Sequence, residues 1–375
     1  MPINQLPTPV PQARKLCTAD LVAAASADAA EGESRRRLTP EVAEALLRAG
    51  FARHFVPSAR GGTAGGFTEL ADALDAVGGG CLSAAWCGLI YATSGRMAAY
   101  LPPEGQREVW AEGPDTAIVA GLVPSGEVEP APGGWLLSGS WRPVSAVDHA
   151  TWALLCAPAG GARESEARFF AVPRSDFAVR DTWDTVGMRA TGSHTVVLDG
   201  VLVPEHRVFS RAALIAGAAG AGAQACHRVP LLGAAPPLFA SVSVGAARAA
   251  LRHLVELTAA RPETAREPAA LEAIAMAGAE IDSAAMLVHR ACAATDTATP
   301  VGADVAARGA RDAAFAARLL RDAVHRAFLA GGGQAQDSAS PLQRIWRDVH
   351  GATSHAVLRW ERNADLHARA LLDGG

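Results

Sequence analysis

The stretch Pro341–Trp360, PLQRIWRDVHGATSHAVLRW, has the clearest pattern in the chain. Its apolar side chains recur at spacings of three and four residues: Leu342, Ile345, Trp346, Val349, Ala352, Ala356, Val357 and Trp360. This spacing predicts a helix with one buried face, with Pro341 in its first turn and Ser340 as its N-cap. On another face, Asp348 and His355 share one stripe two turns apart. A packing helix with two surface histidines would show the same pattern.

Helical patterns also fill the regions before this stretch. Three more long helices are predicted at Phe239–Ala260, Pro268–Ala294 and Ala303–Ala330. With the last helix, Pro341–Leu372, they form a predicted four-helix bundle over residues 237–375.

Residues 1–115 are predicted to be an N-terminal helical domain. Its expected segments are a helix from Pro40 to Gly50, capped by Thr39, an extended stretch at 51–62, a helix at Phe67–Val77, a long buried helix at Cys81–Tyr100 and a helix at Glu104–Glu112.

The pattern changes near Thr116. Short runs of β-branched, aromatic and other apolar residues follow, separated by Gly, Pro and Asp, and these predict strands. The runs are Ala117–Val123, Gly134–Trp141, Thr151–Ala157, Arg168–Val172 and His194–Val203. Residues 116–210 are therefore predicted to be a middle β domain, a barrel or a sandwich. The Ala/Gly-rich segment 211–236 is predicted to be a connector or flap.

Composition excludes several classes of function. Half of the 375 residues are apolar and the formal net charge is −4, so neither a basic stripe nor a nucleic-acid partner is expected. The six cysteines are scattered, which predicts reduced thiols and a cytoplasmic protein. We expect no signal peptide, no membrane span and, without an HExxH or HxxxH spacing, no metal.

Four segments carry a resemblance to a known family. They are LLRAGFARHFVPSARGG at 46–62, GWLLSGSWRPVSAVDHATWALLCA at 134–157, DTVGMRATGSHTVVLDGVLVPEHRVF at 184–209 and PLQRIWRDVHGATSHA at 341–356. In this order and spacing they resemble the acyl-CoA dehydrogenase superfamily, and in particular its flavin-dependent monooxygenase branch. The chain looks most like the oxygenase component of two-component aromatic polyketide hydroxylases of the actinorhodin-pathway type, which serve antibiotic biosynthesis.

The resemblance implies a fold and a chemistry. The fold would be mostly α with a central β domain, and a homotetramer would complete each flavin site. The cofactor would be reduced FMN, with FAD possible. A separate NAD(P)H:flavin reductase would supply it, because the chain has no dinucleotide-binding fingerprint. The reaction would be hydroxylation of a phenolic polycyclic substrate through a 4a-hydroperoxyflavin.

The resemblance also implies roles for individual residues. Ser145 would lie beside the flavin N5, and His355 would take the phenol proton as a base. The residues expected to bind the flavin are Trp86, Ser94, Trp141, Ser145, Trp183, Arg261, Gly332 and Gly333. The residues expected to border the substrate are His54, Phe55 and Arg96. Without the resemblance, Ser145 fits an ordinary turn, the tryptophans fit a core and Arg96 fits a structural pair with a carboxylate.

One departure from the superfamily bears on function. Its dehydrogenases commonly place a catalytic glutamate on the last helix, where this chain has Ala356, and the nearest carboxylate is Glu361. Proton abstraction beside a thioester carbonyl needs a positioned base, so this departure opposes an acyl-CoA dehydrogenase. An N-oxygenase acting on an amino sugar and a non-catalytic partner subunit stay open as alternatives.

Overall fold

The computed structural model describes residues 16–159, 167–260, 267–298 and 300–373. Its N-terminal part is helical: α1 Ala19–Ala27, α2 Ala29–Arg35, α3 Pro40–Ala49, α4 Phe67–Gly78, α5 Leu82–Ala98 and α6 Pro103–Val109. Helix α3 begins as predicted, because Thr39 Oγ1 accepts the Val42 N–H and Pro40 needs no partner in the first turn. It ends at Gly50, whose φ of +94° suits glycine.

The segment 51–62 is a series of turns, so the predicted extended stretch is wrong. The N–H of His54 donates to the carbonyl of Phe51, and a 3-10 turn occupies Ser58–Arg60. Gly61, with a φ of +81°, closes that turn. Such local bonds between nearby backbone groups satisfy the chain without a strand partner.

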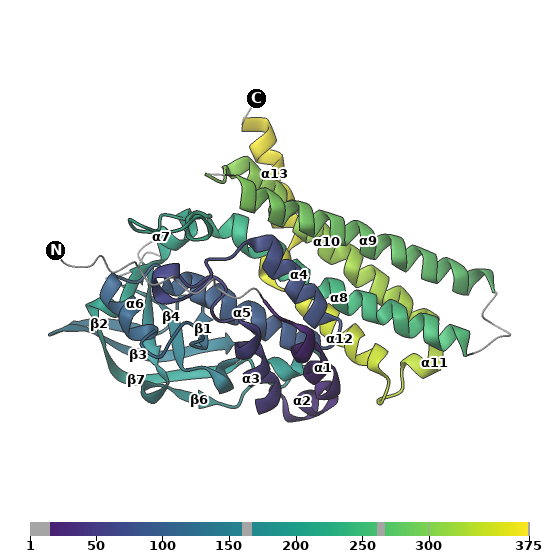
Figure 1. The fold of residues 1–375 in the computed structure, drawn as a ribbon, viewed down its shortest axis with the longest axis horizontal. Helices are drawn as coiled ribbons and strands as arrows, with labels where there is room; N and C mark the ends of the chain where they lie inside the picture. The colour runs from purple at the N-terminus through teal and green to yellow at the C-terminus, as the bar shows by residue number, and fades with distance from the viewer. Residues whose placement is uncertain (1–15, 160–166, 261–266, 299, 374–375) are drawn as a thin grey trace, which may run out of the picture.

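Two four-stranded sheets follow in the middle of the chain, beside the N-terminal helices (Figure 1). The strands are β1 Ile118–Gly121, β2 Glu127–Ala131, β3 Gly134–Val144, β4 Trp152–Pro158, β5 Ala167–Pro173, β6 Ala178–Arg180, β7 His194–Pro204 and β8 Val208–Ser210. The sheets have the orders β1-β4-β5-β8 and β2-β3-β7-β6, and only β1 and β4 pair in parallel among the described strands. Five strands were predicted; β2, β6 and β8 were missed because they are short or highly exposed.

The C-terminal part is helical: α7 Arg211–Ala216, α8 Leu231–Ala259, α9 Pro268–Thr297, α10 Ala303–Ala330, α11 Gly332–Ala335, α12 Pro341–Thr353 and α13 Trp360–Asp373. Figure 1 shows α8, α9 and α10 running side by side away from the sheets. Helix α8 begins well before the predicted Phe239, although Pro236 and Pro237 lie inside it. The Gly233 carbonyl loses its helical partner at Pro237 and instead accepts from Thr295 Oγ1 (3.3 Å).

The predicted single helix over 341–372 is broken at residues 354–359, which is a correction. Pro341 and Ser340 start α12 as predicted, but the helix ends at Thr353. The hydroxyls of Thr353 and Ser354 bond carbonyls of the last turn, and His355 has an extended ψ of 139°. His355 therefore lies in a linker and does not share a helical stripe with Asp348.

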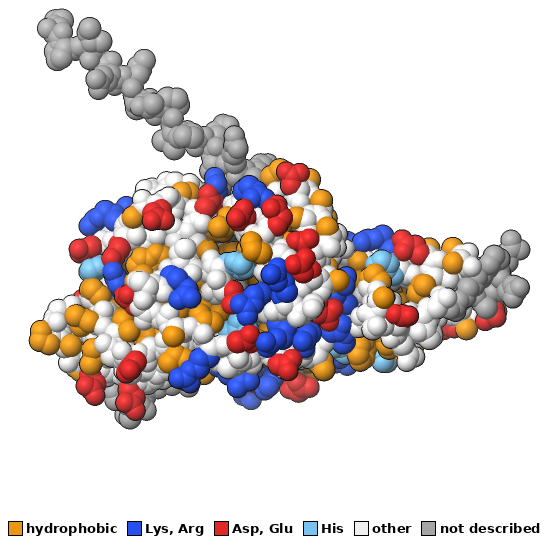
Figure 2. Space-filling view, turned by 90° about the horizontal axis from the view of Figure 1, so that it is seen from below, with side chains coloured by type: hydrophobic (Ala, Val, Ile, Leu, Met, Phe, Trp, Pro, Cys, Tyr) orange, Lys and Arg blue, Asp and Glu red, His pale blue; other side chains and the backbone are white. Residues whose placement is uncertain are grey.

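The middle of the molecule is an apolar core built around α8. This helix has the length and apolarity of a membrane span, but 83% of its most apolar 18-residue window is buried inside the protein. It packs against α4, α5, α9, α10 and α12. On the face drawn in Figure 2, Arg and Asp or Glu side chains lie interspersed at the centre.

Candidate active site

A cavity of about 430 Å³ lies where the sheets meet α5, α8 and the end of α12. Its wall is mostly apolar and aromatic. The lining residues are Trp86, Ile90, Ala120, Gly121, Leu122, Val123, Trp141, Arg142, Pro143, Ser145, Trp183, Thr185, Val186, Gly187, Met188, Thr191, Ser193, Phe239, Gly351, Ala352, Ser354 and His355. A large apolar cavity with a few converging polar groups is the usual form of a small-molecule site.

Ser145 reaches this cavity through the pairing of β3 with β7. The antiparallel register places Val144 opposite His194, so Ser145, just after β3, lies beside Ser193, just before β7. The register shifts between Trp141 and Val144, which turns the end of β3 toward the cavity. The oxygens of Ser145 and Ser193 lie 2.8 Å apart.

Four more hydrogen-bonding groups extend from Ser145 in both directions. Trp86 Nε1 donates to Ser145 Oγ (3.1 Å), while Ser193 Oγ lies 2.7 Å from Thr191 Oγ1. Thr191 Oγ1 in turn lies 2.8 Å from the Met188 carbonyl oxygen. Thr191 and Ser193 are each 2% exposed and, like Ser145, they line the cavity, so this chain of hydroxyls is part of the cavity wall.

His355 enters the cavity from the linker after α12. Its ring stacks on Phe239, with centroids 4.5 Å apart, and meets the edge of Trp86 at 5.5 Å. Burial among these rings lowers the pKa of His355 to about 4, so the imidazole is neutral at neutral pH.

The tautomer of His355 follows from its own backbone. The Val357 N–H donates to His355 Nδ1 (3.4 Å), so in the neutral ring the proton sits on Nε2. The available nitrogen is then a hydrogen-bond donor. The expected role of His355 as a general base stays a prediction, and this geometry also suits a donor that binds an ionised phenol oxygen.

The three predicted tryptophans all line the cavity. Trp141 is 1% exposed and its Nε1 donates to the Cys156 carbonyl (2.6 Å). Trp183 is half-buried, and its Nε1 donates to the Met188 carbonyl (2.9 Å). Each ring is thus fixed by one hydrogen bond and offers its remaining surface to the cavity or the core.

The three residues predicted to border the substrate, His54, Phe55 and Arg96, do not line the cavity. Arg96 donates to the backbone carbonyls of Cys226, His227 and Val229, which fixes the connector before α8 against α5. His54 is buried and bonds the Gly66 carbonyl (2.8 Å), and Phe55 lies in the core. The partners of the buried Arg96 guanidinium are therefore backbone carbonyls and not the structural carboxylate that the sequence suggested.

Of the remaining predicted flavin residues, those that the structure describes do not line the cavity of their own chain. Ser94 is buried on α5 outside the lining set. Gly332 and Gly333 lie in α11, at the end of the bundle away from the sheets (Figure 1). Arg261 lies outside the described residues.

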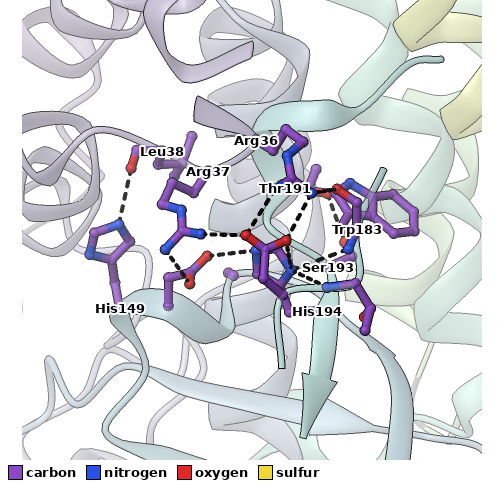
Figure 3. Close-up of polar contacts among 12 residues, drawn as sticks. Arg36, Arg37, Leu38, His149, Trp183, Thr191, Ser193 and His194 are labelled. Atoms are coloured by element: carbon purple, nitrogen blue, oxygen red, sulfur yellow. Dashed lines mark hydrogen bonds and ion pairs between the residues drawn. The ribbon is translucent and has the colours of Figure 1, made fainter. Parts of the chain in front are cut away.

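A polar cluster around the buried His194, missed by sequence reasoning, supports the cavity wall (Figure 3). His194 is fully buried, and its Nδ1 accepts the N–H groups of Thr182 and Trp183, both at 3.2 Å. Its Nε2 therefore carries the proton and lies 3.5 Å from Asp148 Oδ2, while Arg37 donates to the same carboxylate (3.2 Å). Burial lowers the pKa of His194, so it stays neutral and holds the backbone that presents Trp183.

Comparisons with known proteins agree with this fold. The family described as acyl-CoA dehydrogenase, C-terminal domain, matches residues 238–360. The oxygenase component of the FADH(2)-dependent resorcinol hydroxylase of Rhizobium sp. (strain MTP-10005) is 30% identical, over 92% of this chain and 90% of that protein. The crystal structure of 3-HSA hydroxylase from Rhodococcus sp. RHA1 aligns with a TM-score of 0.88 and 28% identity, over 94% of this chain and 95% of that one.

A second solved structure is XiaF from Streptomyces sp. in complex with FADH2 and glycerol. It aligns with a TM-score of 0.88 and 28% identity, over 95% of this chain and 94% of that one. The relatives span the helical, β and bundle parts together, as the resemblance in the four sequence segments implied. The chain therefore belongs to the family of oxygenase components of flavin-dependent monooxygenases, on the acyl-CoA dehydrogenase fold.

Proposed function

We propose that this protein hydroxylates a phenolic polycyclic compound of the aromatic polyketide class. It would use O₂ and reduced FMN, with FAD as the alternative flavin. One oxygen atom enters the aromatic ring, the other leaves as water, and the flavin leaves oxidised. A separate NAD(P)H:flavin reductase then restores the reduced flavin.

The cavity fits a flavin ring by its chemistry. Trp86, Trp141 and Trp183 offer flat apolar surface, and Ser145 offers a hydroxyl oxygen at the wall. Bound reduced flavin supplies the electrons that activate O₂. Ser145 would hold the N5 edge of the ring, and the surrounding apolar side chains would exclude the water that favours loss of hydrogen peroxide.

The observation that carries the proposal is the position of Trp86 between the two proposed catalytic side chains. Its Nε1 donates to Ser145 and its ring edge meets the His355 ring, so one side chain sets the spacing of both. His355 Nε2–H would hold the ionised phenol oxygen of the substrate. The ring carbon to be hydroxylated is thereby oriented toward the flavin side of the cavity.

The lining also favours an aromatic phenol over the alternatives. No Asp or Glu is among the described residues that line the cavity, and Ala356 is not replaced by a carboxylate from elsewhere in that set. A dehydrogenase would need a carboxylate base there, and an amino sugar would need polar partners. An apolar cavity of about 430 Å³ suits a polycyclic ring system.

We further propose a homotetramer in the cytoplasm. Large apolar side chains stay exposed on α8, α9 and α10: Val255, Leu271, Met276, Met286, Phe315 and Leu329. A neighbouring subunit would cover them, and its Arg261 or Gly332–Gly333 region would complete each flavin site.

The test is reconstitution. Purified protein is mixed with FMN, a flavin reductase, NADH, ¹⁸O₂ and a naphthol-type polyketide, and the product is analysed by mass spectrometry. A hydroxylated product with one ¹⁸O atom is expected. Omitting the oxygenase under the same conditions gives the background. Hydrogen peroxide as the sole oxygen product, across phenolic polycyclic substrates, would contradict the proposal.

A further inference from the structure

Three hydroxyl groups in the cavity wall form a hydrogen-bonded chain with fixed ends. At one end Trp86 Nε1 can only donate, and at the other the Met188 carbonyl can only accept. Between these ends lie the hydroxyls of Ser145, Ser193 and Thr191, with oxygen–oxygen distances of 2.8, 2.7 and 2.8 Å along the chain to Met188.

The number of hydroxyl protons decides which group donates in each of these hydrogen bonds. Each oxygen–oxygen contact needs one proton between its atoms, since two lone pairs at such distances repel. The three contacts must take all three hydroxyl protons, because the Met188 carbonyl has none. Thr191 therefore donates to Met188, Ser193 to Thr191, and Ser145 to Ser193.

Ser145 then has no proton left for the cavity. It receives the Trp86 N–H on one lone pair and presents the other as an acceptor. A ligand atom at this position must be a donor to be held. Reduced flavin carries a hydrogen on N5, whereas the N5 of oxidised flavin is an acceptor with no hydrogen.

We propose that Thr191 and Ser193 are positioning residues that make the site select reduced over oxidised flavin. They do so by directing the Ser145 proton away from the cavity. The N5 lone pair of oxidised flavin then faces a lone pair of Ser145 Oγ, and this repulsion weakens the binding of oxidised flavin. This inference rests on the proposed placement of the flavin N5 at Ser145. It concerns binding, and so it can be measured without substrate or turnover.

The end of the chain is held firmly enough to keep this direction. The Met188 N–H donates to Asp348, and its carbonyl accepts from Trp183 as well as from Thr191. Thr191 and Ser193 lie beside the polar cluster around the buried His194 (Figure 3). The acceptor that ends the chain is therefore fixed from α12 and from the cavity wall.

The experiment compares the affinities of oxidised and reduced FMN in anaerobic titrations of the full-length protein. Thr191→Val removes the oxygen that accepts the Ser193 hydroxyl proton. Ser193 can then donate to Ser145, and the Ser145 hydroxyl can donate into the cavity. Ser193→Ala frees that hydroxyl directly. In both variants the preference for reduced FMN should fall at least about fivefold, the size of one net hydrogen bond, mainly through tighter binding of oxidised FMN.

A second readout is the midpoint potential of bound FMN. Preference for reduced flavin raises the potential, so the fivefold loss should lower it by about 20 mV for this two-electron couple. Thr191→Ser keeps the hydroxyl and should keep both values. Thr93→Val is the control, because Thr93 on α5 does not line the cavity and its hydroxyl donates to the Leu89 carbonyl (2.7 Å).

The outcomes separate this inference from the function on which it rests. If Ser145→Ala changes the preference while Thr191→Val and Ser193→Ala leave it unchanged, the inference is wrong. Ser145 would then contact N5, but Thr191 and Ser193 would not determine whether Ser145 donates or accepts. If all three leave it unchanged, the flavin placement itself is wrong. Should Thr191→Val fail to fold, Ser193→Ala alone decides.

Discussion

Asp348 on α12 accepts the backbone N–H of Met188, with 2.5 Å between Oδ1 and N. Met188 lies in the segment between β6 and β7 and has a left-handed φ of +57°. A buried carboxylate thus holds a strained turn whose carbonyl accepts from both Trp183 and Thr191. The C-terminal bundle and the β part meet at this contact, directly behind the cavity wall.

Asp348 should make the protein less stable as the pH rises. Burial raises the pKa of Asp348 from 3.8 to about 6. Between these values the folded protein binds more protons than the unfolded chain, so stability falls with rising pH, by about 3 kcal/mol in total. Asn cannot ionise, so the stability of Asp348→Asn relative to the wild type should grow by about 2.4 kcal/mol between pH 4 and pH 8, since part of the change falls below pH 4. Urea denaturation at both pH values measures it.

Asp199→Asn is the control, because Asp199 is an exposed carboxylate in β7. Its stability relative to the wild type should change little over the same pH range. A constant difference between Asp348→Asn and the wild type from pH 4 to pH 8 would show that Asp348 does not titrate in this window.

Ser145→Ala should uncouple NADH oxidation from hydroxylation. The variant loses the acceptor proposed for the N5 hydrogen of reduced flavin, so activated oxygen escapes as hydrogen peroxide before transfer. Peroxide formed per NADH should rise about fivefold, in line with the loss of one net hydrogen bond. Ser354→Ala is the control, since Ser354 also lines the cavity but donates to the Gly351 carbonyl (2.7 Å). Equal coupling in the two variants would remove Ser145 from the flavin site.

The protein should be a tetramer whose flavin sites need the neighbouring subunit. Light scattering should give four times the chain mass of 38.6 kDa. Met286→Glu or Phe315→Glu, on exposed apolar surface of α9 and α10, should lower that mass and weaken flavin binding together. Leu202 in β7 is also an exposed apolar side chain, but it lies outside the bundle. Leu202→Glu should therefore change neither the mass nor flavin binding. A fully active monomer would contradict this prediction.

The fold was largely predictable, because the spacing of apolar residues and the positions of turn residues predicted most of the helices and strands. The exceptions have local causes. At 354–359, the hydroxyls of Thr353 and Ser354 bond the last carbonyls of α12 and end it, although the apolar spacing continues. The 51–62 segment satisfies its backbone by successive turns, which an apolar–polar pattern does not distinguish from a strand.

The site was predictable only in part. His355, Ser145 and the three tryptophans could be named from the resemblance, and the structure brings them to one cavity. The hydrogen-bond partners of these residues could not be predicted. Ser193 meets Ser145 only because of the β3–β7 register, and Asp348 meets Met188 across 160 positions of sequence. Such pairings depend on three-dimensional packing, for which a single sequence has no signal.

The role of His355 gives the last prediction. Transfer of a phenol proton, with a pKa near 10, to an imidazole with a pKa of about 4 is uphill by about 8 kcal/mol, so His355 is a poor base. As a donor through Nε2 it would hold the phenol oxygen. His355→Ala should therefore lower kcat/KM for hydroxylation at least about tenfold, the loss of a hydrogen bond to a charged group. His355→Gln, which retains an N–H donor, should recover part of it.

The pH dependence separates a donor from a base. For a base, the loss in His355→Ala would shrink between pH 7 and pH 9, as more substrate arrives already ionised. For a donor, the ionised oxygen still needs its partner, so the loss should persist at pH 9. His350→Ala is the control, because the His350 ring bonds the Trp346 carbonyl (2.7 Å) outside the cavity. Equal losses in His350→Ala and His355→Ala would mean that neither histidine touches the substrate.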